Sequence, residues 1–200
     1  MQRTLLAAGI FFTAVFSSGQ SHAQQFFDSG EVSVAIERAF GFHYAHRSID
    51  PPGPGEFDFN GTAFGLGWYG EISPYHATRA AVDVFVIDQL SIGGSIAFFA
   101  QSGDPDDNAV LFAPRVGYAI PLSSLFTFWP RGGFTFIDFE DDSMFALSGE
   151  AAFVLTPQPT WGIILAPTLD IGVFGDFGVD DTDYFELALG IPAVGILGNF

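Results

Sequence analysis

Cysteine and lysine are both absent from the 200-residue chain. Without cysteine, the chain has neither a disulfide framework nor a thiolate metal site. The basic residues are six arginines, against 23 acidic residues, and the formal net charge is −17. Because nucleic acid binding requires a basic surface that neutralises phosphates, this charge balance argues against a nucleic acid partner.

After the N-terminus the sequence also lacks a run of about 20 uninterrupted apolar residues, which a membrane-spanning helix requires. Yet 48% of the residues are hydrophobic, and the chain contains 25 Phe and 24 Gly. The apolar residues are spread over short segments rich in Phe, Val, Ile and Gly. This distribution is typical of the strands of a transmembrane β-barrel, in which lipid-facing and lumen-facing side chains alternate.

The first 23 residues have the pattern of a cleaved secretory signal peptide. Arg3 supplies positive charge, Leu5–Phe16 form an apolar core, and Ser21-His22-Ala23 has the small residues of a cleavage site. A membrane anchor is the alternative, but about 12 apolar residues are too few to span a bilayer. The sequence therefore predicts a signal peptide at 1–23 and one barrel domain at 24–200.

Eight later segments alternate between apolar and polar residues, as β-strands with one apolar face do. The predicted strands are 31–46, 78–88, 90–101, 109–120, 126–138, 144–156, 160–174 and 183–200. Short turns between them alternate with longer acidic loops, the layout of periplasmic turns and external loops. The sequence therefore predicts an all-β protein, an antiparallel up-and-down transmembrane β-barrel of eight strands with both chain ends in the periplasm.

Residues 60–73 leave the strand count open. They form a ninth candidate strand, whereas bacterial single-chain barrels have even numbers of strands. We therefore expect this segment to extend the first hairpin above the membrane; a ten-stranded barrel is the alternative. In the first strand, Arg38 falls on the apolar face, which predicts either a position near an interface or a bulge that shifts the register.

The last strand, 183–200, is apolar, contains several glycines and ends on Phe200. Such a strand has to pair with the first one, because hydrocarbon allows no backbone group to remain unpaired. Pro192 interrupts the strand and predicts a bulge. With the export signal, the alternating strands and the acidic loops, this ending resembles small outer-membrane barrels of the OmpA, OmpX and OmpW kind.

The resemblance implies a place in the cell outer membrane and a set of partners. In such proteins a terminal Phe is read by the barrel-assembly machinery, a role that falls to Phe200 here. Outer-membrane lipid and lipopolysaccharide are the expected surroundings, and the chain is expected to be a monomer.

Charged residues fall on the inward side of the predicted strands, at Asp83, Arg115, Arg131, Glu150, Asp170 and Glu186. The interior of an eight-stranded barrel is just wide enough to be filled by side chains, and buried charges have to be paired. These residues therefore predict a charge network in the lumen, which either fills the barrel or forms a constriction that gates small solutes. Proline precedes both arginines, which suggests bulges that aim the guanidinium groups inward.

Three acidic loops offer carboxylate oxygens, the ligands that Ca²⁺ and Mg²⁺ prefer. The candidate cation ligands are Asp104, Asp106, Asp107, Asp141, Asp142, Asp180 and Asp181. Solvated loops that bind no specific ion are the alternative.

The residues form no recognisable catalytic motif. The histidines after the leader are His43, His46 and His76, and no serine or carboxylate lies at a motif spacing from them, although a serine nucleophile needs a base within reach. His43 and His46 point to opposite faces of a strand and predict no metal site. We expect a structural or surface-interaction barrel that is not an enzyme and needs no cofactor; a narrow solute channel and a lipid-modifying enzyme are the alternatives.

Overall fold

The computed structural model describes residues 27–50, 57–66, 73–101, 107–139, 142–176 and 183–200. The predicted signal peptide lies outside these residues. Across them the chain forms ten strands and one 3-10 turn, η1, at Pro74–His76. No helix in this part of the chain is long and apolar enough to cross a membrane.

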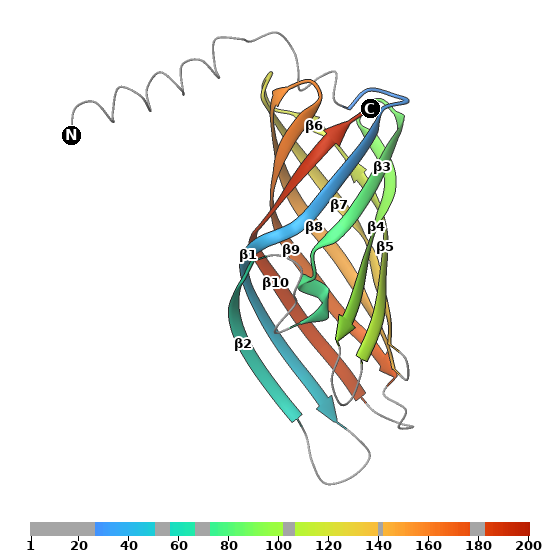
Figure 1. The fold of residues 1–200 in the computed structure, drawn as a ribbon, viewed down its shortest axis with the longest axis vertical. Helices are drawn as coiled ribbons and strands as arrows, with labels where there is room; N and C mark the ends of the chain where they lie inside the picture. The colour runs from blue at the N-terminus through green and yellow to red at the C-terminus, as the bar shows by residue number, and fades with distance from the viewer. Residues whose placement is uncertain (1–26, 51–56, 67–72, 102–106, 140–141, 177–182) are drawn as a thin grey trace, which may run out of the picture.

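The strands form one antiparallel sheet that closes on itself as a barrel (Figure 1). Their bounds are β1 Val32–Asp50, β2 Phe57–Leu66, β3 Arg79–Ile87, β4 Leu90–Gln101, β5 Asp107–Tyr118, β6 Ile120–Pro121, β7 Phe126–Phe139, β8 Ser143–Gln158, β9 Trp161–Asp176 and β10 Asp183–Asn199. Eight of them form the ring, in the order β1, β3, β4, β5, β7, β8, β9 and β10. The predicted fold class and the eight-stranded ring are confirmed.

The first and last strands close the ring. β1 pairs with β10 over its whole length, and the backbones of Val32 and Phe200 exchange hydrogen bonds of 3.1 and 3.0 Å. Phe200 and the start of β1 therefore lie at the same end of the barrel, which we call the terminal end (Figure 1). We call the opposite end, where the β1–β2 hairpin lies, the loop end.

β1 changes its partner halfway along its length. Residues 32–37 pair with β3, whereas residues 40–49 pair with β2. Among the described residues, β2 has no strand on its other side, so the β1–β2 hairpin extends past the ring at the loop end (Figure 1). The prediction that this segment extends the first hairpin and adds no strand to the ring is confirmed.

A bulge in β1 accounts for the charged residue on its apolar face. Arg38 has a positive φ of 55°, and the register between β1 and β10 shifts between Ile36 and Phe40. As a result Glu37 and Arg38 are both buried, although neighbouring side chains of a regular strand point to opposite faces. The sequence allows two explanations for Arg38, a position near an interface or a bulge. The structure shows the bulge.

The prolines of the ring differ in their effect on the register. The register between β9 and β10 shifts at Pro192, as predicted. The prediction of bulges at Pro114 and Pro130 is wrong, because the pairing of β4 with β5 and of β7 with β8 continues through both prolines without a shift. The ordinary alternation of a strand is therefore enough to turn Arg115 and Arg131 inward.

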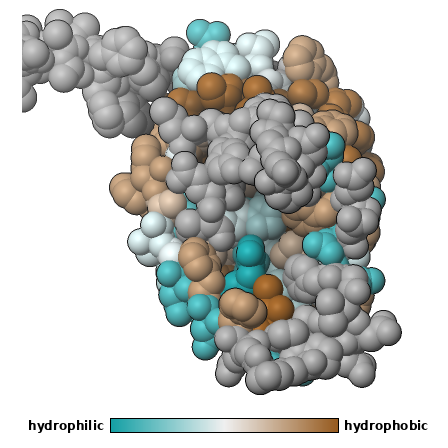
Figure 2. Space-filling model, turned by 60° about the horizontal axis from the view of Figure 1, so that its bottom comes forward, coloured by the Kyte–Doolittle hydropathy of each residue, from teal (hydrophilic) through white to brown (hydrophobic). Residues whose placement is uncertain are grey.

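Large apolar side chains cover the outside of the ring. Exposed Phe, Val, Ile or Leu side chains occur on every ring strand, among them Ile36, Val84, Phe98, Val116 and Leu147. Figure 2, which brings the loop end forward, shows hydrophobic side chains along the wall and hydrophilic ones gathered toward the loop end. A closed ring with an apolar outer wall suits a bilayer, which offers the backbone no hydrogen bonds.

Candidate functional site

The lumen is filled in three layers, of which the layer at the terminal end is apolar. Phe27 precedes β1, and its ring centroid lies 5.2 Å from that of Phe85 and 5.5 Å from that of Trp129. The Phe27 carbonyl accepts a hydrogen bond of 2.8 Å from the N–H of Gln89. The three aromatic residues are at most 1% exposed, so this layer excludes water from the terminal end of the lumen.

The layer at the loop end is built around η1, which lies inside the barrel mouth (Figure 1). Tyr75 of η1 is fully buried and belongs to an apolar cluster with side chains from β4, β5, β7, β8 and β10. Its hydroxyl oxygen lies 3.4 Å from the hydroxyl oxygen of Tyr184. Its carbonyl accepts hydrogen bonds from Arg38 and Arg79, so η1 connects this layer to the charged residues next to it.

The third layer lies between these two and consists of charged residues. We call it the charge belt, and its members are Glu37, Arg38, Arg79, Asp83, Arg115, Arg131, Glu150 and Asp170. With four arginines and four carboxylates, the charge belt as a whole is neutral. Balanced charge matters here, because taking an unpaired charge out of water costs several kcal/mol.

Glu37 joins two arginines on the side of the belt nearest β3. It accepts hydrogen bonds of 2.6 and 2.9 Å from the two terminal nitrogens of Arg115, and a further one from Arg131 Nη1. Arg115 also donates from Nε to Asp83 Oδ1 at 3.1 Å. These four side chains are at most 8% exposed. Bidentate, charge-assisted bonds of this kind are the strong ones in proteins.

Glu150 and Asp170 form the other side of the belt. Arg38 donates to Asp170 Oδ2 at 2.7 Å and to Glu150 Oε1 at 3.2 Å, while Arg131 donates to Glu150 Oε2. The hydroxyl of Ser148 donates to Asp170 Oδ1 at 2.6 Å. Because Arg131 binds both Glu37 and Glu150, the two sides form one network across the lumen.

Arg79 is the member of the belt that lacks an ion pair within the described residues. It is 2% exposed and donates to the hydroxyl of Thr135 at 3.3 Å and to the carbonyl of Tyr75. Both acceptors are uncharged. The guanidinium group of Arg79 is therefore buried without a carboxylate in direct contact.

A separate ion pair lies nearer the loop end. Arg47 Nε donates to Glu186 Oε2 at 2.7 Å, and the same oxygen accepts a hydrogen bond of 2.9 Å from the hydroxyl of Tyr184. Glu186 is fully buried, whereas the side chain of Arg47 is 29% exposed. With this pair, every arginine after Arg3 lies in the lumen.

The structure places all six charged residues singled out in the sequence inside the barrel. Five of them, Asp83, Arg115, Arg131, Glu150 and Asp170, belong to the charge belt, and Glu186 belongs to the separate pair.

Four further charged residues of the lumen escape prediction from the sequence: Glu37, Arg38, Arg47 and Arg79. The sequence contains a signal for two of them. Arg79 lies four residues before Asp83 on the same strand and so on the same face, and Glu37 falls on the inward face of β1. Arg38 gives no such signal, since only the bulge turns its side chain inward.

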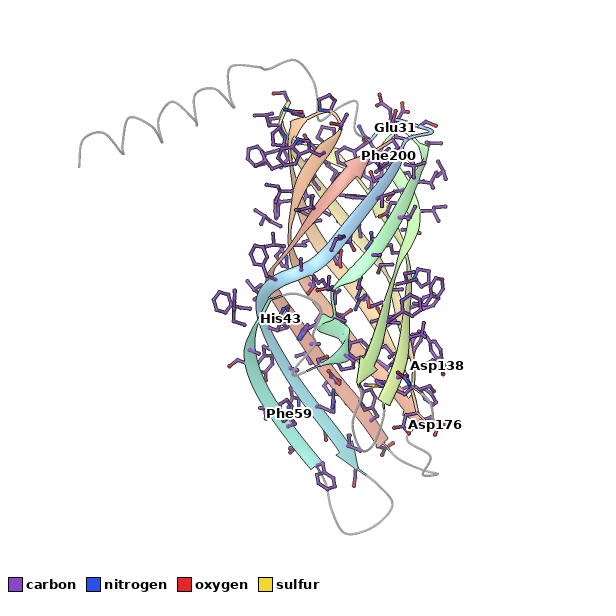
Figure 3. All side chains as sticks on the ribbon, viewed as in Figure 1. Glu31, His43, Phe59, Asp138, Asp176 and Phe200 are labelled. Carbon is purple, nitrogen blue, oxygen red and sulfur yellow. The ribbon has the colours of Figure 1, made fainter. Side chains whose placement is uncertain are left out.

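The histidines form no catalytic pair with a serine or a carboxylate among the described residues. His43 on β1 and His76 on η1 are buried and stacked, with ring centroids 4.3 Å apart; Figure 3 shows His43 beside η1. His46 contacts Asn60 Oδ1 through Nδ1 at 2.9 Å. In the part of the chain that the structure describes, no histidine hydrogen-bonds a serine or a carboxylate.

Most candidate cation ligands of the loops lie outside the described residues, namely Asp104, Asp106, Asp141, Asp180 and Asp181. Asp107 begins β5 and Asp142 precedes β8, both at the loop end, where Figure 3 also shows Asp138 and Asp176. Over the described ranges, no group of three or more His, Asp or Glu side chains is placed to hold a metal ion.

The barrel is similar to solved structures of outer-membrane proteins. The solid-state NMR structure of the outer membrane protein AlkL in DMPC lipid bilayers aligns with a TM-score of 0.53 and 10% identity, over 87% of this chain and 92% of that one. The crystal structure of Neisserial surface protein A aligns with a TM-score of 0.51 and 11% identity, over 86% of this chain and 98% of that one. The fold is that of a small bacterial outer-membrane β-barrel. No protein-family model and no curated protein sequence matches the chain, so the likeness establishes the fold alone.

Proposed function

We propose that this barrel is closed to solutes and acts in the outer membrane as a structural or surface-interaction protein. The observation that carries the proposal is the charge belt, which crosses the lumen between two apolar layers. A solute would have to displace Phe27, then the belt, then Tyr75. Moving one of the ion-paired belt residues aside disrupts buried ion pairs, which costs several kcal/mol.

Planar-bilayer recording on the purified, folded barrel tests the closed lumen. We expect the wild-type protein to show no steady single-channel steps. Glu150→Gln weakens the belt at the carboxylate that Arg38 and Arg131 share, and Asp138→Asn is a matched control at the loop end, outside the belt. Steady wild-type steps that change with Glu150→Gln, and not with Asp138→Asn, would overturn the proposal in favour of a narrow solute channel.

The proposal includes export and a defined orientation, with the terminal end in the periplasm. Its support is the layout of the connections, since the tight Asp88–Gln89 turn lies at the terminal end, and the strand ends that flank the acidic segments 102–106, 140–141 and 177–182 lie at the other. Residues 1–23 are proposed to be removed on export. Phe200, which is 81% exposed, is proposed as the signal read by the barrel-assembly machinery.

Cell fractionation, with electrophoresis before and after boiling, tests this location. We expect the protein in the outer-membrane fraction, with a mobility that changes on boiling and a mass that lacks the leader. A protein that is soluble in the periplasm and shows no such change would contradict the proposal. Its apolar outer wall would then have to be the core of a soluble fold.

We further propose that the barrel is not an enzyme, and that outer-membrane lipid and lipopolysaccharide surround it without being its substrates. Support comes from the buried stack of His43 and His76, because neither ring hydrogen-bonds a serine or a carboxylate among the described residues. General-base catalysis would require such a contact with the nucleophile. Overexpression is expected to leave the lipid A and phospholipid composition unchanged. Altered lipids that return to normal with His43→Phe or His46→Phe would establish the lipid-modifying alternative.

A further inference from the structure

A small, partly open cavity borders the charge belt, between it and the stretch of β7 that includes the exposed residues Gly132 and Phe134. Its volume is about 20 Å³, and its wall includes Ser95 and the belt residues Arg38, Arg79, Arg115, Arg131 and Glu150. A cavity needs roughly 10–15 Å³ to hold one water molecule. This cavity therefore has room for a single water or for a monatomic ion of similar size.

The wall of the cavity is rich in hydrogen-bond donors that have no acceptor. Within the described residues, Arg38 Nε, Arg79 Nε, Arg131 Nε and the Ser95 hydroxyl are buried and make no hydrogen bond. Unsatisfied buried donors are rare in folded proteins, and each calls for an explanation. The carboxylate of Glu150 is bound by terminal nitrogens of Arg38 and Arg131 and accepts from none of these four donors.

The charges around the cavity are unevenly paired. Arg38, Arg115 and Arg131 each contact two carboxylates within 3.2 Å. Arg79 contacts none among the described residues, although it is equally buried. The eight belt charges sum to zero, but Arg79 has no described carboxylate within ion-pair distance. A buried charge is tolerated when it is paired and hydrogen-bonded, so the local electrostatic potential next to Arg79 favours a ligand that carries negative charge.

We propose that the cavity binds one small monovalent anion of the halide class. A water molecule makes two to four hydrogen bonds, of which its own two protons must donate some, whereas a halide only accepts and suits a wall whose residues carry unpartnered donors. The size of the cavity excludes oxyanions such as sulfate, which carry several oxygens. The anion gives Arg79 a direct counter-ion and satisfies Ser95. This site goes beyond the proposed function, because it does not depend on whether the lumen conducts.

Bromide is the probe for a direct test, because it scatters X-rays anomalously. Crystals of the whole mature barrel grown in sodium bromide are expected to show one bromine peak in the cavity, beside Arg79 and Ser95. Density there without an anomalous signal, which identifies water, would overturn the proposal. An absence of any density in the cavity would overturn it as well.

Thermal unfolding in sodium chloride or sodium gluconate, at equal ionic strength, tests the site without crystals. A ligand that binds only the folded state raises the unfolding temperature, and gluconate is too large for the cavity. We therefore expect a midpoint a few degrees higher in chloride. Equal midpoints for the wild-type protein in the two salts would overturn the proposal.

Two variants locate the halide effect. Arg79→Gln should abolish the difference between chloride and gluconate, whereas Arg47→Gln changes a lumen arginine outside the cavity and should retain it. A halide effect that survives Arg79→Gln would overturn the site. If Arg79→Gln does not fold, the wild-type measurements in bromide and in the two sodium salts still decide the question.

Discussion

The two halves of the barrel are closed in different ways. In the terminal half, β1 pairs with β10 on one side and with β3 on the other. In the loop half, β1 leaves β3 and takes β2, beyond which no described strand follows. The mouth there is filled by η1, whose residues Tyr75 and His76 are buried. Backbone pairing therefore closes one half, and side-chain packing closes the other.

The surroundings of each half explain the difference. On the outward face of the β1–β2 hairpin, Phe42 and Phe64 are exposed and apolar, whereas the next outward positions along β2 toward the loop end include Asn60 and Asp58. Lipid demands a complete ring of hydrogen bonds, whereas water can satisfy the open edge of a strand. We therefore expect the open edge of β2 to lie where the hairpin leaves the bilayer.

The largest effect is expected from breaking the charge belt. Glu37→Gln removes a carboxylate that binds both Arg115 and Arg131, and leaves the buried belt with one positive charge in excess. We expect the free energy of unfolding to fall by about 3–5 kcal/mol, measured by urea unfolding in lipid vesicles with tryptophan fluorescence.

The matched variant in the loop half is Glu186→Gln. Its partner Arg47 is 29% exposed and can be hydrated when the pair is lost, so we expect a loss of only about 1 kcal/mol. Equal losses in the two variants would show that the charge belt is no more strongly coupled than the pair at the loop end.

A second comparison tests the apolar layer at the terminal end. Phe27→Ala removes a ring that packs on Phe85 and Trp129, and we expect it to lower the free energy of unfolding by about 3 kcal/mol. Phe57→Ala at the loop end removes a ring that is 69% exposed, and should change stability by less than about 0.5 kcal/mol. A negligible effect of Phe27→Ala would mean that the segment before β1 does not seal the lumen.

A third comparison locates the edge of the bilayer on the outer wall. Ile36 faces outward in the terminal half and is 53% exposed, so Ile36→Arg is expected to cost about 2 kcal/mol, as an arginine on the lipid face does. Thr62→Arg, on the outward face of β2, should cost about 1 kcal/mol or less. Refolding yield into vesicles and urea midpoints measure both, and similar costs would place β2 in lipid.

The strands of the ring could be predicted from the sequence because alternation is a local signal. β4 has its predicted bounds, Leu90–Gln101, and the ends of the other ring strands differ by a few residues. The same alternation turns Asp83 and Glu150 toward the lumen. Fold class and six of the inward charges therefore follow from residues close together in the chain.

The contacts within the lumen could not be predicted, because they depend on the stagger of the whole ring. Glu37 of β1 accepts a hydrogen bond from Arg131 of β7 across the barrel. No local sequence pattern predicts that these two side chains are in contact. Phe27 and Tyr75 lie in segments without alternation, and their burial depends on the space that the ring leaves open. For Arg38 the sequence allows either a position near an interface or a bulge, and only the pairing of β1 with β10 decides for the bulge.

The smallest effect is expected at the terminal end, where one carboxyl links stability to pH. Partial burial and the nearby carboxylates of Asp88 and Glu31 raise the pKa of Asp28 above its ordinary value of 3.8. The folded state therefore holds this proton to a higher pH than the unfolded chain does, so stability falls as the pH rises through the raised pKa. Asp28→Asn should remove this part of the change in urea midpoint between about pH 4 and about pH 7. If the midpoint of the variant changes as much as that of the wild type, Asp28 does not contribute to the pH dependence of the terminal end.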